Sequence, residues 1–251
     1  MSEKIKITVP SGIGDNLWVL MTLDKSKTYE VEICKSNINR GKQIYDLMDK
    51  SFIADAYYSD KVYPKDCDYN VNHHLEAGKR IEDFNGTVNY KLPWKLGKGK
   101  GAFVKSDEFI YFGIYTSNIN NNKNWKGWAN PDDWKKFMDG IKYLVPNVKF
   151  VGIGAEYDDL MDSLEFDYTL RGEPLAKVIK TIKNLDFMFG YPSGIPILAE
   201  YFGVNTFMFF PDKLNKMQNT FCRKESISKE WKGCSFTYPH KAVEWIKNNW
   251  L

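Results

Sequence analysis

The sequence holds few of the residues that build metal centres and disulfide frameworks. Its 251 residues include only three histidines and four cysteines. The cysteines form no CxxC pair and lie far apart, at Cys34, Cys67, Cys222 and Cys234. We therefore expect reduced thiols and neither a disulfide scaffold nor a catalytic metal site.

Long hydrophobic runs are also lacking. No apolar stretch approaches the roughly 18 to 20 residues that cross a bilayer, and residues 1–9 form a short charged start followed by a strand, unlike a signal peptide. We therefore expect a cytoplasmic protein. The net charge of +3 falls well short of the basic stripe of a dedicated nucleic-acid binder and suits phosphorylated small molecules.

The chain instead alternates short apolar runs with segments of helical period, which is typical of α/β units around a mostly parallel sheet. Its apolar content of 43% and charged content of 27% are those of a globular protein. In the first half we expect strands at 4–9, 29–34, 54–58 and 69–72, with helices at 17–23 and 39–50.

A segment rich in glycine and lysine separates two halves of one architecture. Residues 96–106, LGKGKGAFVKS, interrupt any hydrophobic period. We therefore predict an N-terminal acceptor-binding domain over 1–104 and a C-terminal nucleotide-binding domain over 105–251. In the second half the expected strands are 109–114, 148–153, 187–189 and 206–210, and the expected helices are 132–143, 174–184, 194–202 and 239–249.

The first motif, PSGIGDNL at residues 10–17, lies where the first strand passes into the first helix. Open α/β sheets bind ligands at this position, and glycines allow the backbone to approach them. Gly12 and Gly14 supply two glycines of a dinucleotide fingerprint, but Leu17 stands at the third. Asp15 has two interpretations, an N-cap of the helix or a functional carboxylate.

The second half carries a further set of motifs. A polar loop contains Lys123-Asn124-Trp125, a strand ends at Gly154-Ala155-Glu156, and the block from Asp186 has glycine or small residues at fixed offsets. The members of this block are Asp186, Gly190, Ser193, Gly194, Ala199 and Gly203. Together with Gly14-Asp15, these motifs resemble the heptosyltransferase-like glycosyltransferases, typified by the ADP-heptose:lipopolysaccharide heptosyltransferases. The similarity covers most of the chain in the right order.

The resemblance implies an α/β protein of two Rossmann-like domains that face a cleft, the GT-B architecture, with a C-terminal helix that returns to the N-terminal domain. It implies metal-independent transfer of a sugar from a nucleoside-diphosphate donor, without a cofactor. Asp15 matches the family's catalytic base. The donor-binding residues expected on this basis are Lys123, Glu156, Ser193, Gly194 and Thr116. On the acceptor side we expect Gly12, Gly14, His73 and His74.

The chain departs from the family at two positions of the late block. Pro192 replaces an acid, and Ile197 replaces a histidine. The diphosphate site must therefore be built differently, and the donor's identity stays open. We expect the acceptor to be a glycan or glycolipid, as in the resembled family, or a modified DNA base, which the lysines concentrated around the linker could contact. Two alternatives to a transferase are a non-catalytic nucleotide- or sugar-binding protein and an NAD-binding oxidoreductase.

Overall fold

A computed structural model describes residues 4–35, 40–62, 66, 68, 91–116, 131–156, 158–190, 193–208, 240 and 242–250. The chain forms two compact units, Met1–Gly97 and Lys98–Leu251. Each unit is described by itself below. No helix among the described residues is long and apolar enough to cross a membrane.

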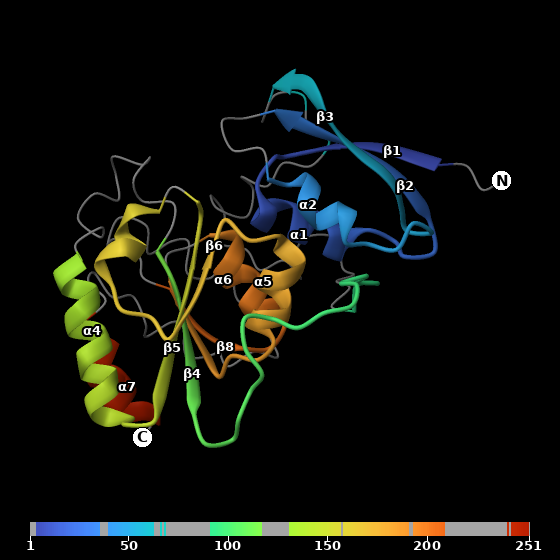
Figure 1. Cartoon of the computed structure of the whole chain (residues 1–251). Helices are drawn as coiled ribbons and strands as arrows, with labels where there is room; N and C mark the ends of the chain where they lie inside the picture. Colours follow the sequence, from blue (N-terminus) through green and yellow to red (C-terminus); the bar gives the residue numbers. More distant parts are fainter. Residues whose placement is uncertain are drawn as a thin grey trace. The chain divides into compact units, whose positions relative to one another are not determined.

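The N-terminal unit is built on a parallel sheet of three strands in the order β1-β2-β3. The strands are β1 (Lys4–Val9), β2 (Thr28–Lys35) and β3 (Ile53–Val62), and they are connected by α1 (Ile13–Thr22) and α2 (Lys42–Asp46). Figure 1 shows both helices on the same face of this sheet. The strands expected at 4–9, 29–34 and 54–58 are confirmed.

The two faces of this sheet differ in polarity because side chains alternate along each strand. Val9, Val31 and Ile33 are wholly buried on the apolar set of positions. On the alternate set, the Glu32 carboxylate lies 2.8 Å from Lys61 Nζ and 3.7 Å from Lys6 Nζ. These two ion pairs of Glu32 therefore lie on the face opposite to Val9, Val31 and Ile33.

The C-terminal unit is a parallel sheet in the order β6-β5-β4-β7-β8 with helices packed around it (Figure 1). The strands are β4 (Ile110–Tyr115), β5 (Val148–Gly154), β6 (Tyr168–Arg171), β7 (Phe187–Gly190) and β8 (Asn205–Met208). The helices are α4 (Pro131–Leu144), the 3₁₀ helix η3 (Asp159–Ser163), α5 (Leu175–Ile182), α6 (Gly194–Tyr201) and α7 (Ala242–Trp250). This strand order is that of a Rossmann-like fold.

An aromatic column forms the core of this second unit. The Phe112 ring on β4 stacks on Phe189 of β7 at 5.2 Å between centroids, and Phe189 stacks in turn on Phe207 of β8 at 4.9 Å. Phe137 of α4 closes the column at 4.8 Å from Phe189. These four phenylalanines therefore pack the sheet against α4.

The glycine- and lysine-rich segment after residue 97 is packed against the C-terminal unit. Ala102 N–H donates to the Thr181 hydroxyl at 2.8 Å, and Lys105 Nζ pairs with Asp186 at 2.5 Å. The Phe103 ring stacks on Tyr111 at 4.3 Å. This segment therefore belongs to the second unit, although its glycines indicate a free linker.

On the other side of Gly97, the chain is held by the N-terminal unit. Lys95 N–H donates to the Leu47 carbonyl at 2.6 Å, and Lys95 Nζ lies 2.8 Å from the Asp49 carboxylate. Gly97 itself has φ +68°, with open space where a Cβ would stand. The units thus divide between Gly97 and Lys98, earlier than the expected division after residue 104.

Three details of the expected element map differ from the structure. The first helix starts at Ile13 instead of residue 17, α2 is shorter than the expected 39–50, and β6 was not anticipated. The expected strand at 69–72 lies outside the described residues. α7 packs on α4, where Gly140 leaves room for the Val243 side chain, and the expected return of this helix to the first unit stays a prediction.

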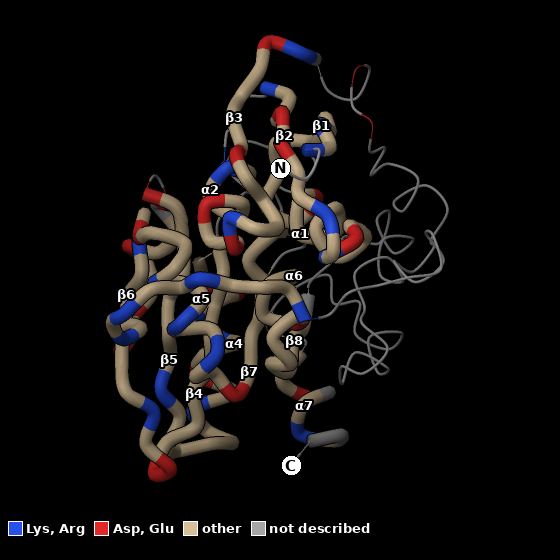
Figure 2. Tube along the Cα trace, turned by 90° about the vertical axis from the view of Figure 1, so that its right-hand side faces the viewer, with Lys and Arg blue, Asp and Glu red and all other residues tan. Residues whose placement is uncertain are grey.

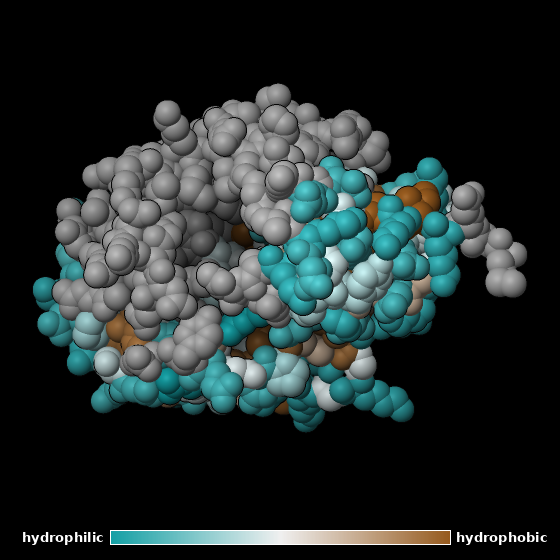
Figure 3. Space-filling model, turned by 90° about the horizontal axis from the view of Figure 1, so that it is seen from above, coloured by the Kyte–Doolittle hydropathy of each residue, from teal (hydrophilic) through white to brown (hydrophobic). Residues whose placement is uncertain are grey.

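The described surface is mixed in charge and mainly hydrophilic. Basic and acidic residues are interspersed along the described segments (Figure 2), and hydrophilic residues predominate on the described face in Figure 3. Among the described residues the exposed large hydrophobic side chains are Ile5, Val104 and Tyr143. These three are scattered along the chain, as is normal for a protein surface.

Candidate functional site

Asp15 lies in the first turn of α1, directly after the carboxyl end of β1. Gly12 occupies the N-cap position, with φ −78° and ψ 145°, and α1 starts at Ile13. The N-cap interpretation of Asp15 is therefore wrong. No described residue donates a hydrogen bond to its half-buried carboxylate, and burial raises the pKa of Asp15 to about 6.

The Asp15 carboxylate folds back over the turn that precedes it. A Cβ atom added at Gly12 would lie 2.7 Å from Asp15 Oδ2, so only glycine leaves room for this conformation. Gly14 is buried within α1. The acceptor-side roles of Gly12 and Gly14 stay predictions, but the structure places both in the same turn as Asp15.

The turn is fastened by residues that the sequence motifs did not single out. The Asn16 side chain donates to the carbonyls of Pro10 and Gly12, and it accepts a hydrogen bond from the Tyr45 hydroxyl of α2. The burial of the Asn16 amide, which marks it in the structure, cannot be read from one sequence. The signal that could have found it is the asparagine directly after the candidate base.

In the C-terminal unit, the strand order reverses direction between β4 and β7. The chain proceeds from β4 through β5 to β6 on one side and from β7 to β8 on the other. Tyr115 at the end of β4 pairs in register with Gly190 at the end of β7. Ligands of open α/β sheets bind outside the carboxyl ends of the strands at such a switch point.

Thr116 follows β4 at this switch point. Its hydroxyl donates to Asp158 Oδ2 at 2.6 Å, and both side chains are about 2% exposed. Because the Thr116 hydroxyl donates its hydrogen to Asp158, its oxygen could only accept a hydrogen bond from a ligand. Asp158 is a further residue that the motifs did not indicate.

Ser193 immediately precedes α6 and is its N-cap residue by position. Its backbone is extended, with φ −161° and ψ 168°, and its side chain makes no capping hydrogen bond. The hydroxyl instead lies 3.3 Å from the Tyr115 hydroxyl. The two hydroxyl groups and the start of α6 at Gly194 therefore lie together at the ends of β4 and β7.

The loop after β5 carries Glu156, whose side chain is exposed. Arg171 Nε donates to the Glu156 carbonyl at 2.8 Å, and Arg171 Nη1 lies 2.5 Å from Asp162 Oδ1. Gly172 has φ +65°, and a Cβ there would come within 3.1 Å of Glu156 Cβ. The end of β6 thus contacts this loop through Arg171 and Gly172.

The structure places four of the five expected donor residues at one edge of the second sheet. Thr116, Glu156, Ser193 and Gly194 all follow carboxyl ends of strands. Lys123, His73 and His74 lie outside the described residues. Asp186, a member of the late motif, lies at the opposite end, where its carboxylate accepts from Tyr111 N–H at 2.9 Å and pairs with Lys105.

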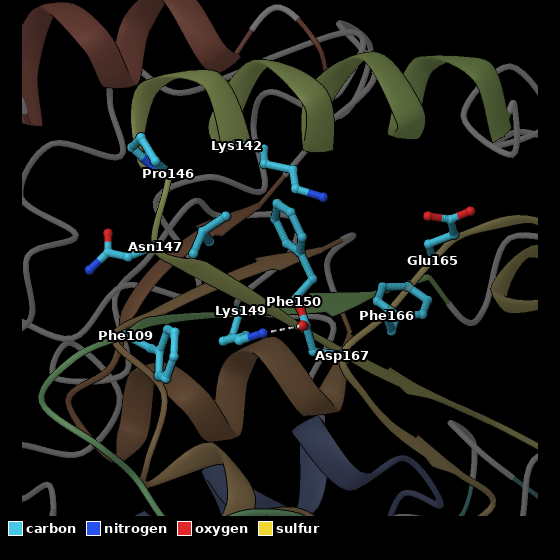
Figure 4. A pocket seen from close by; sticks show the side chains of 10 residues that line it. Phe109, Lys142, Pro146, Asn147, Lys149, Phe150, Glu165, Phe166 and Asp167 are labelled. Atoms are coloured by element: carbon cyan, nitrogen blue, oxygen red, sulfur yellow. Dashed lines mark hydrogen bonds and ion pairs between the residues drawn. The ribbon is translucent and has the colours of Figure 1, made fainter.

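Two pockets of the second unit also lie away from this edge. One, of about 300 Å³, is lined by residues around Phe109, Lys142, Lys149 and Phe166 at the amino end of β5. Figure 4 shows Lys149 Nζ paired with Asp167 in it, at 2.7 Å. The other, of about 390 Å³, lies between α4 and the η3 region. Neither includes a predicted site residue.

The described part of the chain contains no cluster of three or more His, Cys, Asp or Glu side chains that could hold a metal ion.

The comparisons with known proteins agree with one another at the level of fold. No protein-family model matches the sequence, and no curated protein matches it. E. coli ADP-heptose LPS heptosyltransferase II superposes with a TM-score of 0.54 at 11% identity, over 98% of this chain and 98% of that chain.

A second solved protein is the iron-containing dodecameric glycosyltransferase TibC from enterotoxigenic E. coli. It matches with a TM-score of 0.52 at 13% identity, over 99% of this chain and 77% of that chain. The TibC heptosyltransferase in complex with ADP-D-β-D-heptose gives 0.54 at 13% identity, over 98% and 75%. The chain has the GT-B fold of heptosyltransferase-like glycosyltransferases.

At 11–13% identity the GT-B likeness concerns the fold. It confirms the expected two Rossmann-like domains and the resemblance first drawn from the motifs. The roles of individual side chains rest on the geometry of this chain.

Proposed function

We propose that this GT-B chain is a glycosyltransferase that moves a sugar from a nucleoside-diphosphate donor to an acceptor hydroxyl, with Asp15 as the base. The observation that carries the proposal is the Asp15 carboxylate, whose pKa burial raises to about 6. A general base works best when its pKa lies near the working pH. The glycosyltransferases of the same fold support the reaction class.

For the donor, we propose the carboxyl edge of the second sheet. The first N–H groups of α6, after Ser193, would meet the diphosphate at the positive end of the helix dipole. Glu156 would accept hydrogen bonds from the ribose hydroxyls, and the Thr116 oxygen would accept one more. Lys123 would stabilise the charge that develops on the departing diphosphate, so that no metal ion or cofactor is required.

For the acceptor, we propose a glycan or glycolipid, with Gly12, Gly14, His73 and His74 on its side. Two of the lysines around the linker are paired with acids, because Lys95 lies 2.8 Å from Asp49 and Lys105 lies 2.5 Å from Asp186. Such pairing leaves less positive charge for a DNA phosphate backbone. A modified DNA base is the competing acceptor, and salt-dependent binding of a DNA duplex would favour it.

The test of the proposal is a panel of nucleotides followed by an assay of turnover. The full chain is heated with ADP, UDP, GDP, ADP-D-β-D-heptose or NAD⁺, because a ligand that binds only the native state raises its apparent stability. We expect one nucleoside diphosphate and its sugar to stabilise the chain and the sugar to be released or transferred. Stabilisation by NAD⁺ alone would favour an oxidoreductase.

The catalytic role of Asp15 is tested with Asp15→Asn. We expect this variant to keep its stabilisation by the nucleotide and to lose turnover by about 10²-fold or more. Asp60→Asn, at an acid on β3 whose side chain is 94% exposed, is the matched control and should behave as the wild type. Binding of a nucleotide sugar without turnover in the wild type would instead indicate a non-catalytic binding protein.

A further inference from the structure

The side chain of Asn16 makes three specific hydrogen bonds although it is wholly buried. Its amide nitrogen donates to the Pro10 carbonyl at 2.8 Å and to the Gly12 carbonyl at 2.7 Å. Both carbonyls belong to the turn between β1 and α1. A side chain needs two N–H donors in one group to make this pair of bonds, and asparagine is the shortest that has them.

The third bond comes from a different helix. The Tyr45 hydroxyl of α2 donates to Asn16 Oδ1, and Tyr45 is also wholly buried. This bond orients the amide, because an oxygen that faces Tyr45 directs the amide nitrogen toward the two carbonyls. A chain of hydrogen bonds therefore runs from Tyr45 on α2 through Asn16 to the turn that precedes Asp15.

The residue just before α2 makes an independent contact with the same turn. Gly41 N–H donates to the Ser11 carbonyl at 2.7 Å. A Cβ atom at Gly41 would stand 2.4 Å from Asn16 Nδ2, so the backbone of α2 closes directly over the amide. Residues 10–12 are thus held directly by Gly41, the N-cap of α2, and indirectly by Tyr45 of α2 through Asn16.

Asp15 depends on this conformation because its carboxylate lies over Gly12, whose carbonyl Asn16 holds. We propose that Asn16 and Tyr45 are positioning residues that hold the turn so that the Asp15 carboxylate stays fixed and shielded from water. The inference deepens the proposed function, since it assigns to this pair the placement of the proposed base. Neither residue touches the substrate in this role.

The pKa of the Asp15 carboxyl is the quantity that tests this proposal. Loss of hydration is the cause of its raised pKa, and no charged side chain among the described residues contributes to it. A looser turn admits water and stabilises the carboxylate, so the pKa falls toward the ordinary value of 3.8. The midpoint of the Asp15 titration therefore reports how firmly the turn is held.

The experiment is a carboxyl NMR titration of the full chain with ¹³C-labelled aspartate, in which Asp15→Asn identifies the Asp15 signal. Tyr45→Phe removes only the hydroxyl that orients Asn16. We expect it to lower the Asp15 midpoint by about one pH unit, and Asn16→Ala to lower it at least as far. Tyr29→Phe is the matched control, because Tyr29 is also buried and its hydroxyl accepts from Asp24 N–H at 3.2 Å.

The proposal is overturned if Tyr45→Phe and Asn16→Ala leave the Asp15 midpoint where Tyr29→Phe leaves it. Thermal unfolding of the three variants, recorded in parallel, shows that each remains folded over the titrated range. The titration needs no substrate, so it is separable from the proposed function. A lowered midpoint combined with full turnover by Asp15→Asn would refute Asp15 as the base while upholding its dependence on Asn16.

Discussion

The Thr116 hydroxyl donates a 2.6 Å hydrogen bond to the buried carboxylate of Asp158. This bond joins the end of β4 to the segment after β5, and donor contacts are proposed from both of these places. A hydrogen bond to a charged group contributes about 1.5–3 kcal/mol. The bond therefore holds the segments that follow β4 and β5 together at this edge of the second sheet.

We expect Thr116→Val to lower the free energy of unfolding by about 1.5–3 kcal/mol, because the Asp158 carboxylate loses a donor while the shape of the side chain is kept. Urea unfolding measures this change. Thr169→Val, at an exposed threonine on β6, is the control and should stay within about 0.5 kcal/mol of the wild type. Equal stability of the two variants would show that the Thr116 bond contributes little.

The pH dependence of turnover follows from the raised pKa of Asp15. A base must be ionised to accept a proton, so activity should be low below the pKa and should rise with an apparent midpoint near 6. The slope at low pH should be that of one proton. A pH profile of donor turnover between pH 4.5 and about 8 measures it, and a profile that is flat below pH 6 would contradict Asp15 as the base.

The same pKa has a consequence of defined sign for stability. Because the folded pKa lies above the unfolded value of 3.8, ionisation is disfavoured in the folded state. The contribution of Asp15 to the free energy of unfolding is therefore fully present below pH 3.8 and is lost as the pH rises through about 6. Asp15→Asn removes this loss. Above pH 7 its free energy of unfolding should exceed that of the wild type by about 1–2 kcal/mol, since water near the half-buried carboxylate lowers the full effect of the pKa shift.

Phe103 should contribute strongly to the stability of the second unit. It is 7% exposed and stacks on Tyr111 at 4.3 Å, so Phe103→Ala should cost about 3 kcal/mol or more. Its neighbour Val104 is 64% exposed, and Val104→Ala should cost less than about 0.5 kcal/mol. Urea unfolding monitored by aromatic circular dichroism separates the two, and a small effect of Phe103→Ala would indicate that the segment is not firmly packed.

Gly172 should matter for nucleotide binding through Glu156. Gly172→Ala both strains a backbone with φ +65° and brings a Cβ within 3.1 Å of Glu156 Cβ, so the Glu156 loop must move. Gly203→Ala is the matched control, because Gly203 has φ +80° and open space at its Cβ. Both substitutions should cost about 1–2 kcal/mol, but only Gly172→Ala should weaken nucleotide binding as measured by calorimetry.

Much of the fold could be predicted from the sequence because strong hydrophobic periods are local. β1 alternates apolar residues with Lys and Thr, β5 contains a mainly apolar run, and α4 starts at Pro131 with two acids. β6 was missed because Tyr168–Arg171 is a four-residue strand at the sheet edge in which only Leu170 is buried. Such a segment carries no period that distinguishes it from a loop.

The candidate site could be predicted only in part, since its supports are distant in sequence. The motif identified Asp15 from its position after a strand, but Tyr45 lies 29 residues from its partner Asn16. Tyr115 similarly meets Ser193 across 78 residues. The start of α1 was placed too late because the glycines of the turn indicate a loop, whereas Gly14 is tolerated in the first helical turn.

The packing of residues 98–105 also decides how the second half can be produced as a separate polypeptide. A fragment beginning at residue 105, the boundary suggested by composition, would lack the ring that covers Tyr111 and Tyr168 and the backbone that bonds Thr181. It would present bare aromatic surface to water and tend to aggregate. A fragment beginning at Lys98 retains Ala102 and Phe103, and so keeps these contacts.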